Sequence, residues 1–195
     1  MSSVDFFDTQ FQRQVSASEF ALNPFERLAL PYLKGDVLDL GCGLGNLALE
    51  AARAGCRVTA LDGSPTGIAR IRESAANQGL AVEAHEADLS TYAIGRDYDA
   101  IVAIGLLMFF SQPQAEAMLA DIVVHVKSGG VVVLNVLTVD TSFLGMFEPG
   151  HYHLFPVGAM KAALPGWEIL AESHDTFPAP GDTLKVFDTV IARRP

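Results

Sequence analysis

Three glycines alternate with other residues in the segment Asp39-Leu40-Gly41-Cys42-Gly43-Leu44-Gly45, directly after a short apolar run. A strand that ends in glycines and leads into a helix brings backbone N–H groups close to a ligand, because no Cβ blocks the approach. Dinucleotide sites use the spacing Gly-x-Gly-x-x-Gly for a pyrophosphate. Here the spacing is shorter and Asp39 precedes the turn. Because a carboxylate suits a cationic amino-acid group better than a pyrophosphate, the turn favours S-adenosylmethionine, whose methionine end carries an ammonium, over NAD.

Two further acidic residues follow the next predicted strands, Asp62 after residues 57–61 and Asp88 after residues 81–87. Ligands of open α/β sheets bind at the carboxyl ends of the strands. A carboxylate at Asp62 could accept hydrogen bonds from ribose hydroxyls, and one at Asp88 from an adenine amino group. Each acid alone is equally well explained as a helix cap. The three acids and the glycines together favour a nucleoside cofactor.

The elements that must position these residues alternate between strand and helix, which predicts an α/β fold with a doubly wound, mostly parallel sheet. Two final strands flank a turn at residues 178–182 and should pair as an antiparallel hairpin. We expect strands over residues 37–40, 57–61, 81–87, 98–104, 131–137, 167–174 and 185–192, and helices over 24–33, 46–54, 65–78, 113–126 and 157–164.

The composition fits one globular domain over residues 1–195, since half of the residues are hydrophobic and 18% are charged. A net charge of −10 disfavours a nucleic-acid substrate and an anionic membrane surface. The two cysteines have neither a disulfide framework nor a metal-site spacing. With no secretory signal and no apolar run long enough for a membrane helix, a cytoplasmic location is expected.

The segment Val37–Gly45 resembles the first motif of the class I S-adenosylmethionine-dependent methyltransferases, and residues 58–64 and 87–89 resemble the second and third motifs. Residues 98–102 and 127–130 are similar to the family's fourth strand and to the turn before its fifth. The resemblance implies a Rossmann-like core over residues 35–195, with a seven-stranded sheet of order 3-2-1-4-5-7-6 and strand 7 antiparallel. It also implies S-adenosylmethionine as cofactor, bound by Asp39, Gly41, Cys42, Gly43, Gly45, Asp62, Gly63, Asp88, Leu89 and Ile104.

Within that class the chain is similar to the tellurite-resistance (TehB-like) methyltransferases, through residues 106–110, 157–161, 165–168 and 189–194. This likeness implies methyl transfer to a small molecule, such as a chalcogen oxyanion or a thiol. In that family the terminal hairpin carries a His-Arg pair and a further Arg that act on the acceptor. Here the matching positions are His174, Asp175 and Asp182, so both arginines are replaced by acids. An oxyanion would need those cations, which puts tellurite itself in doubt.

We expect the acceptor pocket beside the methyl group to be formed by Gly105, Leu106, Met108, Phe109 and Tyr152. His174 is a candidate general base or acceptor-binding group, and the alternative is a hairpin histidine with no chemical role. His151 and His153 would share one face of an extended segment. Since no third ligand is evident, we interpret this stretch as pocket lining and predict no metal site.

Phe6, Phe7, Phe11 and Phe20 give the polar segment 1–20 several apolar anchors. The segment is predicted to be a mobile arm that closes over the cofactor as a lid. The alternatives are an arm that simply docks on the domain and a subunit contact, so a homodimer stays open. Two other functions also stay open: an S-adenosylmethionine-binding protein or sensor without turnover, and an NAD-dependent oxidoreductase, which Asp39 and the glycine spacing disfavour.

Overall fold

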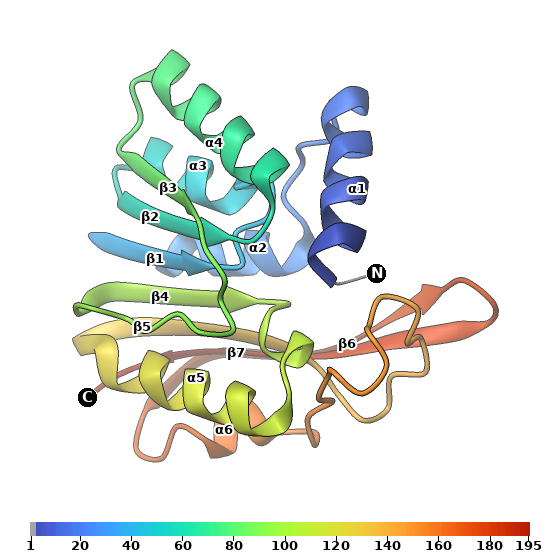
Figure 1. The fold of residues 1–195 in the computed structure, drawn as a ribbon. Helices are drawn as coiled ribbons and strands as arrows, with labels where there is room; N and C mark the ends of the chain where they lie inside the picture. Colours follow the sequence, from blue (N-terminus) through green and yellow to red (C-terminus); the bar gives the residue numbers. More distant parts are fainter. Residues whose placement is uncertain (1–2) are drawn as a thin grey trace.

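The computed structural model describes residues 3–195, and its centre is a seven-stranded sheet of order β3-β2-β1-β4-β5-β7-β6 (Figure 1). The pairs among β1 to β5 are parallel, and β7 runs antiparallel to both β5 and β6. The predicted fold class and strand order are therefore confirmed. The strands are β1 (Asp36–Leu40), β2 (Arg57–Asp62), β3 (Val82–Glu86), β4 (Tyr98–Ile104), β5 (Val126–Leu137), β6 (Glu168–Ala179) and β7 (Thr183–Arg193).

Helices cover both faces of this sheet, and several begin at clear capping signals. Asn23 and Glu26 form a reciprocal capping box at the start of α2, and the Ser64 hydroxyl accepts from the Gly67 N–H in α4. No described helix is long and apolar enough to cross a membrane. The helices are α1 (Ser3–Ala17), α2 (Pro24–Ala29), α3 (Asn46–Arg53), α4 (Pro65–Gln78), α5 (Gln112–His125) and α6 (Ala159–Ala162), with 3₁₀ turns over Leu30–Tyr32 and Leu107–Phe109.

The core divides into two clusters because side chains alternate across each strand. Leu38, Ile101 and Val132 belong to one cluster, together with buried residues of α5 and α6. Their neighbours Val37 and Val102 belong to the other cluster, with buried residues of α2, α3 and α4. Alternate residues of a strand therefore face opposite layers of helices.

The bounds of several elements differ from those predicted from the sequence, in two cases because of a proline or a glycine. The helix expected over residues 24–33 ends at Ala29 and continues as a 3₁₀ turn, because Pro31 has no N–H to donate inside an α-helix. The last helix is shorter than expected, since Gly158 has a φ of +80° and precedes its first turn. The hairpin strands extend to Ala179 and from Thr183, so the turn between them is shorter than predicted.

The N-terminal segment, predicted as an arm, forms helix α1 over Ser3–Ala17. Residues 1 and 2 of the expected arm lie outside the described part of the chain. The helix stands beside α4 at the edge where the parallel strands end (Figure 1). The Asp8 carboxylate ties it there, because it accepts hydrogen bonds from the Ser64 hydroxyl at 2.5 Å and from the Thr66 N–H and hydroxyl at 3.1 Å.

Candidate functional site

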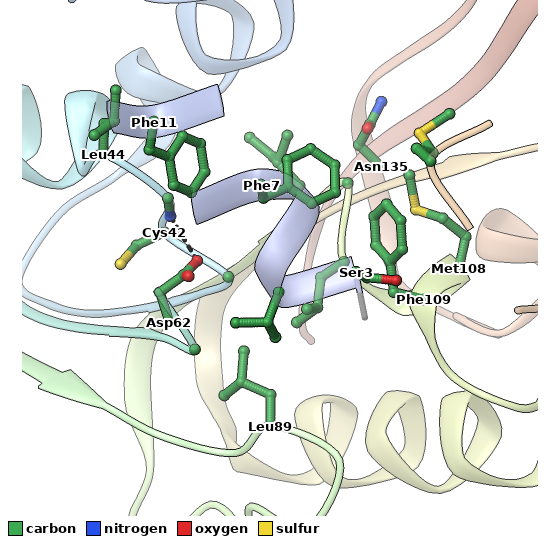
Figure 2. Close-up of a pocket in the computed structure, with 18 of the residues that line it drawn as sticks. Ser3, Phe7, Phe11, Cys42, Leu44, Asp62, Leu89, Met108, Phe109 and Asn135 are labelled. Carbon is green, nitrogen blue, oxygen red and sulfur yellow. Dashed lines mark hydrogen bonds between the residues drawn. The ribbon is translucent and has the colours of Figure 1, made fainter. Parts of the chain in front are cut away.

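A cavity of about 1240 Å³ opens at the carboxyl ends of β1, β2, β4 and β5, with α1 along one side (Figure 2). Its volume exceeds the few hundred Å³ that one small ligand fills, so it has room for a nucleoside cofactor and a second molecule. Nine of the ten expected cofactor residues line it: Asp39, Gly41, Cys42, Gly43, Asp62, Gly63, Asp88, Leu89 and Ile104. Gly45 is not among the lining residues.

The glycine turn is held by hydrogen bonds to β2. The N–H groups of Gly41 and Cys42 both donate to the Leu61 carbonyl, at 2.8 and 3.1 Å, and the Gly43 N–H donates to the Asp62 carboxylate at 2.8 Å. Gly43 has a φ of +55°, and a Cβ there would lie 3.1 Å from the Phe11 ring of α1. The absence of a side chain therefore lets α1 come close to the turn. Burial raises the pKa of the Cys42 thiol, so Cys42 packs as a small apolar side chain.

Gly45 has a different role from the other two glycines of the turn. It caps α3 with a φ of +70°, and a Cβ at this position would lie 2.3 Å from Cγ1 of Ile71 in α4. Packing between α3 and α4, and not contact with a ligand, is what requires glycine here.

Three carboxylates face the same end of the cavity. Asp39 is 5% exposed, and its burial, reinforced by Glu26 and Asp62, raises its pKa to about 8. Burial also raises the pKa of Glu26 and of Asp62, although backbone N–H donors partly offset this. No ion pair to any of the three occurs within residues 3–195. This end of the cavity therefore attracts a cation.

Glu26 is the member of this group that the sequence analysis missed. It lies in the first turn of α2, where its carboxylate accepts from the Asn23 N–H at 2.7 Å. The capping-box spacing Asn23-x-x-Glu26, followed by an apolar helix, was a visible signal for a helix start. That signal does not say that the capped end faces a cavity.

Asp88 lies at a second polar corner of the cavity, after β3. Its carboxylate accepts from the Ser90 hydroxyl at 2.6 Å and from the Ser90 N–H at 2.9 Å, and these bonds lower its pKa. Asp88 is therefore ionised at neutral pH and is oriented by the loop that follows it.

Aromatic side chains form the part of the wall between α1 and the end of β4. The Phe7 and Phe109 rings meet edge to face with centroids 5.2 Å apart, and Phe11 lies 6.0 Å from Phe7 (Figure 2). Gly105, Leu106, Met108 and Phe109 all line the cavity, as expected. Tyr152 does not. It stacks on Phe147 at 4.6 Å, and Phe147 packs against Phe109, so Tyr152 supports the wall from behind.

His174 does not reach the cavity, which corrects the expectation that it acts on the acceptor. It pairs with Asp188 across the hairpin, and its Nδ1 lies 2.5 Å from a carboxylate oxygen of that residue. The adjacent pair Ser173–Thr189 shares its sheet face with Asn135, so His174 faces the opposite side. The bond to Asp188 raises the pKa of His174. Asp188 also accepts from the Gly158 N–H at 2.6 Å, which makes this pair a structural contact near α6.

The two remaining candidate histidines are separated in space. His151 lines the cavity, whereas the His153 ring packs edge-on against Phe155 at 4.6 Å. No cluster of three or more metal-binding side chains is present in the described chain.

Several lining residues from the second half of the chain were not predicted, among them Asn135, Lys185 and Phe187. Asn135 is fully buried in β5, and Lys185 is half-buried in β7. A single amide within the β-branched run of residues 131–137 was the signal that could have pointed to Asn135.

Comparison with known proteins finds methyltransferases among those to which this chain is similar. The profile of a family described as "Methyltransferase domain" matches residues 37–130. Hemagglutinin 1 of Eikenella corrodens is 30% identical over 165 residues, which cover 81% of this chain and 54% of that protein. The probable S-adenosyl-L-methionine-dependent methyltransferase TehB of Haemophilus influenzae is 27% identical over 165 residues, covering 81% and 57%. The chain thus spans a little more than half the length of these relatives.

Solved structures share the fold. The crystal structure of TehB from Haemophilus influenzae matches with a TM-score of 0.78 at 22% identity, over 99% of this chain and 67% of that one. The N-methyltransferase NodS from Bradyrhizobium japonicum, solved in complex with S-adenosyl-L-homocysteine, matches with a TM-score of 0.67 at 18% identity, over 97% and 98%.

Proposed function

We propose that this chain is a class I S-adenosylmethionine-dependent methyltransferase, similar to TehB, and that it transfers the methyl group of S-adenosylmethionine to a small molecule. The observation that carries the proposal is the acidic end of the cavity. Asp39, Glu26 and Asp62 face it beside the glycine turn, and none of them forms an ion pair in the described structure. We propose that residues 1–195 act together as one methyltransferase domain.

The residues present fit this cofactor. Asp39 and Glu26 would take its ammonium, because an adjacent cation favours the ionised form of a buried carboxyl. Asp62, held by the N–H groups of Gly43 and Ser64 at 2.8 Å, would accept from the ribose hydroxyls. Asp88 would accept from the adenine amino group, with Leu89 beside the base. When bound, the cofactor supplies a methyl group that is already activated by the positive charge on its sulfur.

The protein's own contribution is then to position the acceptor in line with the methyl group and to exclude water. Phe7 of α1 and Phe109 close the cavity over the ends of the strands. We propose that the segment 1–20, of which residues 3–20 are described, is a lid that must open for the cofactor to exchange, and that α1 is the part of it beside the cavity.

We propose a thiol as the acceptor in preference to a chalcogen oxyanion such as tellurite. The resemblance to the tellurite-resistance methyltransferases favours chalcogen chemistry. The acids Asp175 and Asp182, however, stand where the tellurite-resistance family has arginines, and the wall beyond Ile104 is largely apolar. The apolar wall suits an organic molecule better than a small hydrated anion, and the two acids, which do not line the cavity, offer no cation to an oxyanion.

Calorimetric titration with S-adenosylhomocysteine and with NADH tests the cofactor. We expect the first to bind at micromolar concentration and the second not to bind. An acceptor screen that follows S-adenosylhomocysteine formation by mass spectrometry then separates a methyltransferase from a binding protein without turnover. Asp62→Ala should abolish binding, whereas His174→Gln, outside the cavity, should leave it unchanged. Equal binding of NADH would contradict the proposal.

A further inference from the structure

Asn135 has a buried polar atom that the described protein does not satisfy. The residue is 0% exposed and lines the cavity, its Nδ2 donates to the Thr189 hydroxyl at 2.9 Å, and its Oδ1 has no hydrogen-bond partner. Buried acceptors almost always have partners, because leaving one unpaired is costly. An unpaired oxygen in the wall of a cavity is therefore a place where a ligand donates a hydrogen bond.

Asn135 lies in the part of the cavity where we expect the methyl acceptor, so the ligand that donates to it should be the acceptor. Asn135 pairs with Ile104 at the end of β4, and its carbonyl accepts from the Gly105 N–H at 3.0 Å. Its side chain lies near Met108 and Phe109, on the far side of Phe7 from Asp62 (Figure 2). The acidic residues that would hold the cofactor's ammonium are at the glycine turn after β1. Asn135 lies on β5, one strand further from that turn than Ile104 of β4, with which it pairs.

Lys185 is a second side chain of this wall without a charge partner. It lines the cavity, its Nζ lies 4.9 Å from the centroid of the Phe143 ring, and burial lowers its pKa. No carboxylate forms an ion pair with it anywhere in residues 3–195. A half-buried ammonium without a counter-ion favours an anionic group of a ligand.

The two residues share one face of the sheet. Asn135 pairs with Thr189 in β7, and Lys185 is four positions earlier in the same strand, about 13 Å away at 3.3 Å per residue. Between them Phe187 packs against Phe25 of α2, with ring centroids 4.8 Å apart. The wall therefore runs from an amide oxygen, along aromatic rings, to a cation.

We propose that this wall is the acceptor subsite and that the acceptor is an organic anion with an apolar body. Its thiol or hydroxyl donates to Asn135 Oδ1, its body lies along Phe187 and Phe25, and its carboxylate pairs with Lys185. This inference rests on the proposed function. In the transfer, the acceptor's sulfur or oxygen forms a bond to the methyl carbon while the bond from that carbon to the sulfonium breaks. The cofactor's sulfur keeps the electron pair, and the acceptor's proton passes to water.

The test compares thiol and hydroxy acids of two to eight carbons, including 4-mercaptobenzoate, with their methyl esters and with selenite. The kcat/KM for S-adenosylhomocysteine formation is measured for each compound. The acids should exceed their esters by about tenfold or more, because the esters lose a charge-assisted contact. Lys185→Gln should remove this preference and Lys185→Arg should retain it. Asn135→Leu should lower kcat/KM about tenfold for acid and ester alike.

A control variant, a replacement variant and the outcomes that would contradict the inference complete the test. His174→Gln is the control for a polar change outside the cavity and should behave as the unmodified protein. If Asn135→Leu fails to fold, Asn135→Ala is measured in its place. Equal rates for acid and ester, a preference that survives Lys185→Gln, faster turnover of selenite, or no turnover of any acid would each overturn the inference. Loss of S-adenosylhomocysteine binding by the unmodified protein would instead overturn the proposed function.

Discussion

At the scale of single residues, Asp39 is a buried acid whose protonation we expect to change when a cation binds beside it. Its pKa of about 8 means that it keeps its proton at neutral pH when nothing cationic is near. A bound ammonium would stabilise the carboxylate and displace that proton. With the role that we propose for Asp39, cofactor binding should be coupled to proton release below pH 8.

The same shift makes the stability of the free protein depend on pH. Above the ordinary pKa of 3.8, the unfolded chain loses the Asp39 proton while the native state keeps it up to about pH 8. The free energy of unfolding should therefore fall as pH rises through this window, by at most about 1.4 kcal/mol per pH unit, and level off above it. Asp39→Asn should flatten the slope in urea titrations at pH 5 and pH 7.5. The exposed Asp97→Asn is the control, and equal slopes for both variants would contradict the assignment.

Gly45 makes a second prediction, about packing and not about binding. Gly45 and Gly79 have φ values of +70° and +62°, but only at Gly45 does a Cβ meet a neighbour, Ile71. Gly79→Ala should cost about 1 to 2 kcal/mol of unfolding free energy from backbone strain alone. Gly45→Ala adds overpacking and should cost about 2 to 5 kcal/mol. Urea unfolding of both variants measures the difference, and equal losses would show that the contact with Ile71 is relieved without cost.

The sequence predicted those site residues whose position follows from the order of strands and helices along the chain. Asp39, Asp62 and Asp88 are all near the end of a predicted strand, so their convergence followed from the parallel sheet. Asn135 and Lys185 were missed because their roles depend on which face of β5 and β7 borders the cavity. His174 was assigned to the acceptor from the resemblance to the tellurite-resistance methyltransferases, and the alternation of side chains along its strand places it on the opposite face of the sheet.

At the scale of elements, α1 packs on the domain through partly buried aromatic rings such as Phe7. None of its residues is classed as buried, and Asp8 adds bonds from Ser64 and Thr66. Segments with little buried apolar surface open at lower free energy than the core. Helix α1 is therefore the element that we expect to move.

Asp8→Ala should loosen this helix and speed the dissociation of S-adenosylhomocysteine several-fold, because the bonds to Ser64 and Thr66 are lost. Stopped-flow displacement measures the rate. Arg13→Ala is the matched control on the same helix, since Arg13 pairs with Glu19 at an exposed position. Unchanged dissociation in Asp8→Ala would show that α1 is not a gate.

Elements with strong local signals were predicted closely, and β4 and α4 have the expected bounds. Helix α1 was not predicted because its anchors are distant in sequence: Asp8 bonds to residues 56 and 58 positions away. A short polar segment of this kind is held by tertiary contacts, which a local pattern does not contain.

At the scale of the whole molecule, the cavity joins parts of the chain that are far apart. Residues of β1, β2 and the loop after β3 are those that we propose for the cofactor, and residues of the loop after β4, of β5 and of β7 are among those that we propose for the acceptor. A ligand that contacts both sides stabilises the folded chain as a unit.

S-adenosylhomocysteine at one hundred times its Kd should raise the free energy of unfolding by about 2.7 kcal/mol. Chemical denaturation followed by circular dichroism measures the change, and NADH at the same concentration is the control ligand. A similar gain with both compounds would mean that the cavity does not distinguish them.

The polar residues of the cavity also divide along the chain. Those that we propose for the cofactor, Glu26, Asp39, Asp62 and Asp88, precede residue 104, and those that we propose for the acceptor, Asn135 and Lys185, follow it. A recombination event in the middle of the gene would therefore exchange one half of the site and leave the other intact. Substitutions in the two halves are free to accumulate at different rates, so descendants of one ancestor can keep a common methyl donor while they diversify in what they methylate.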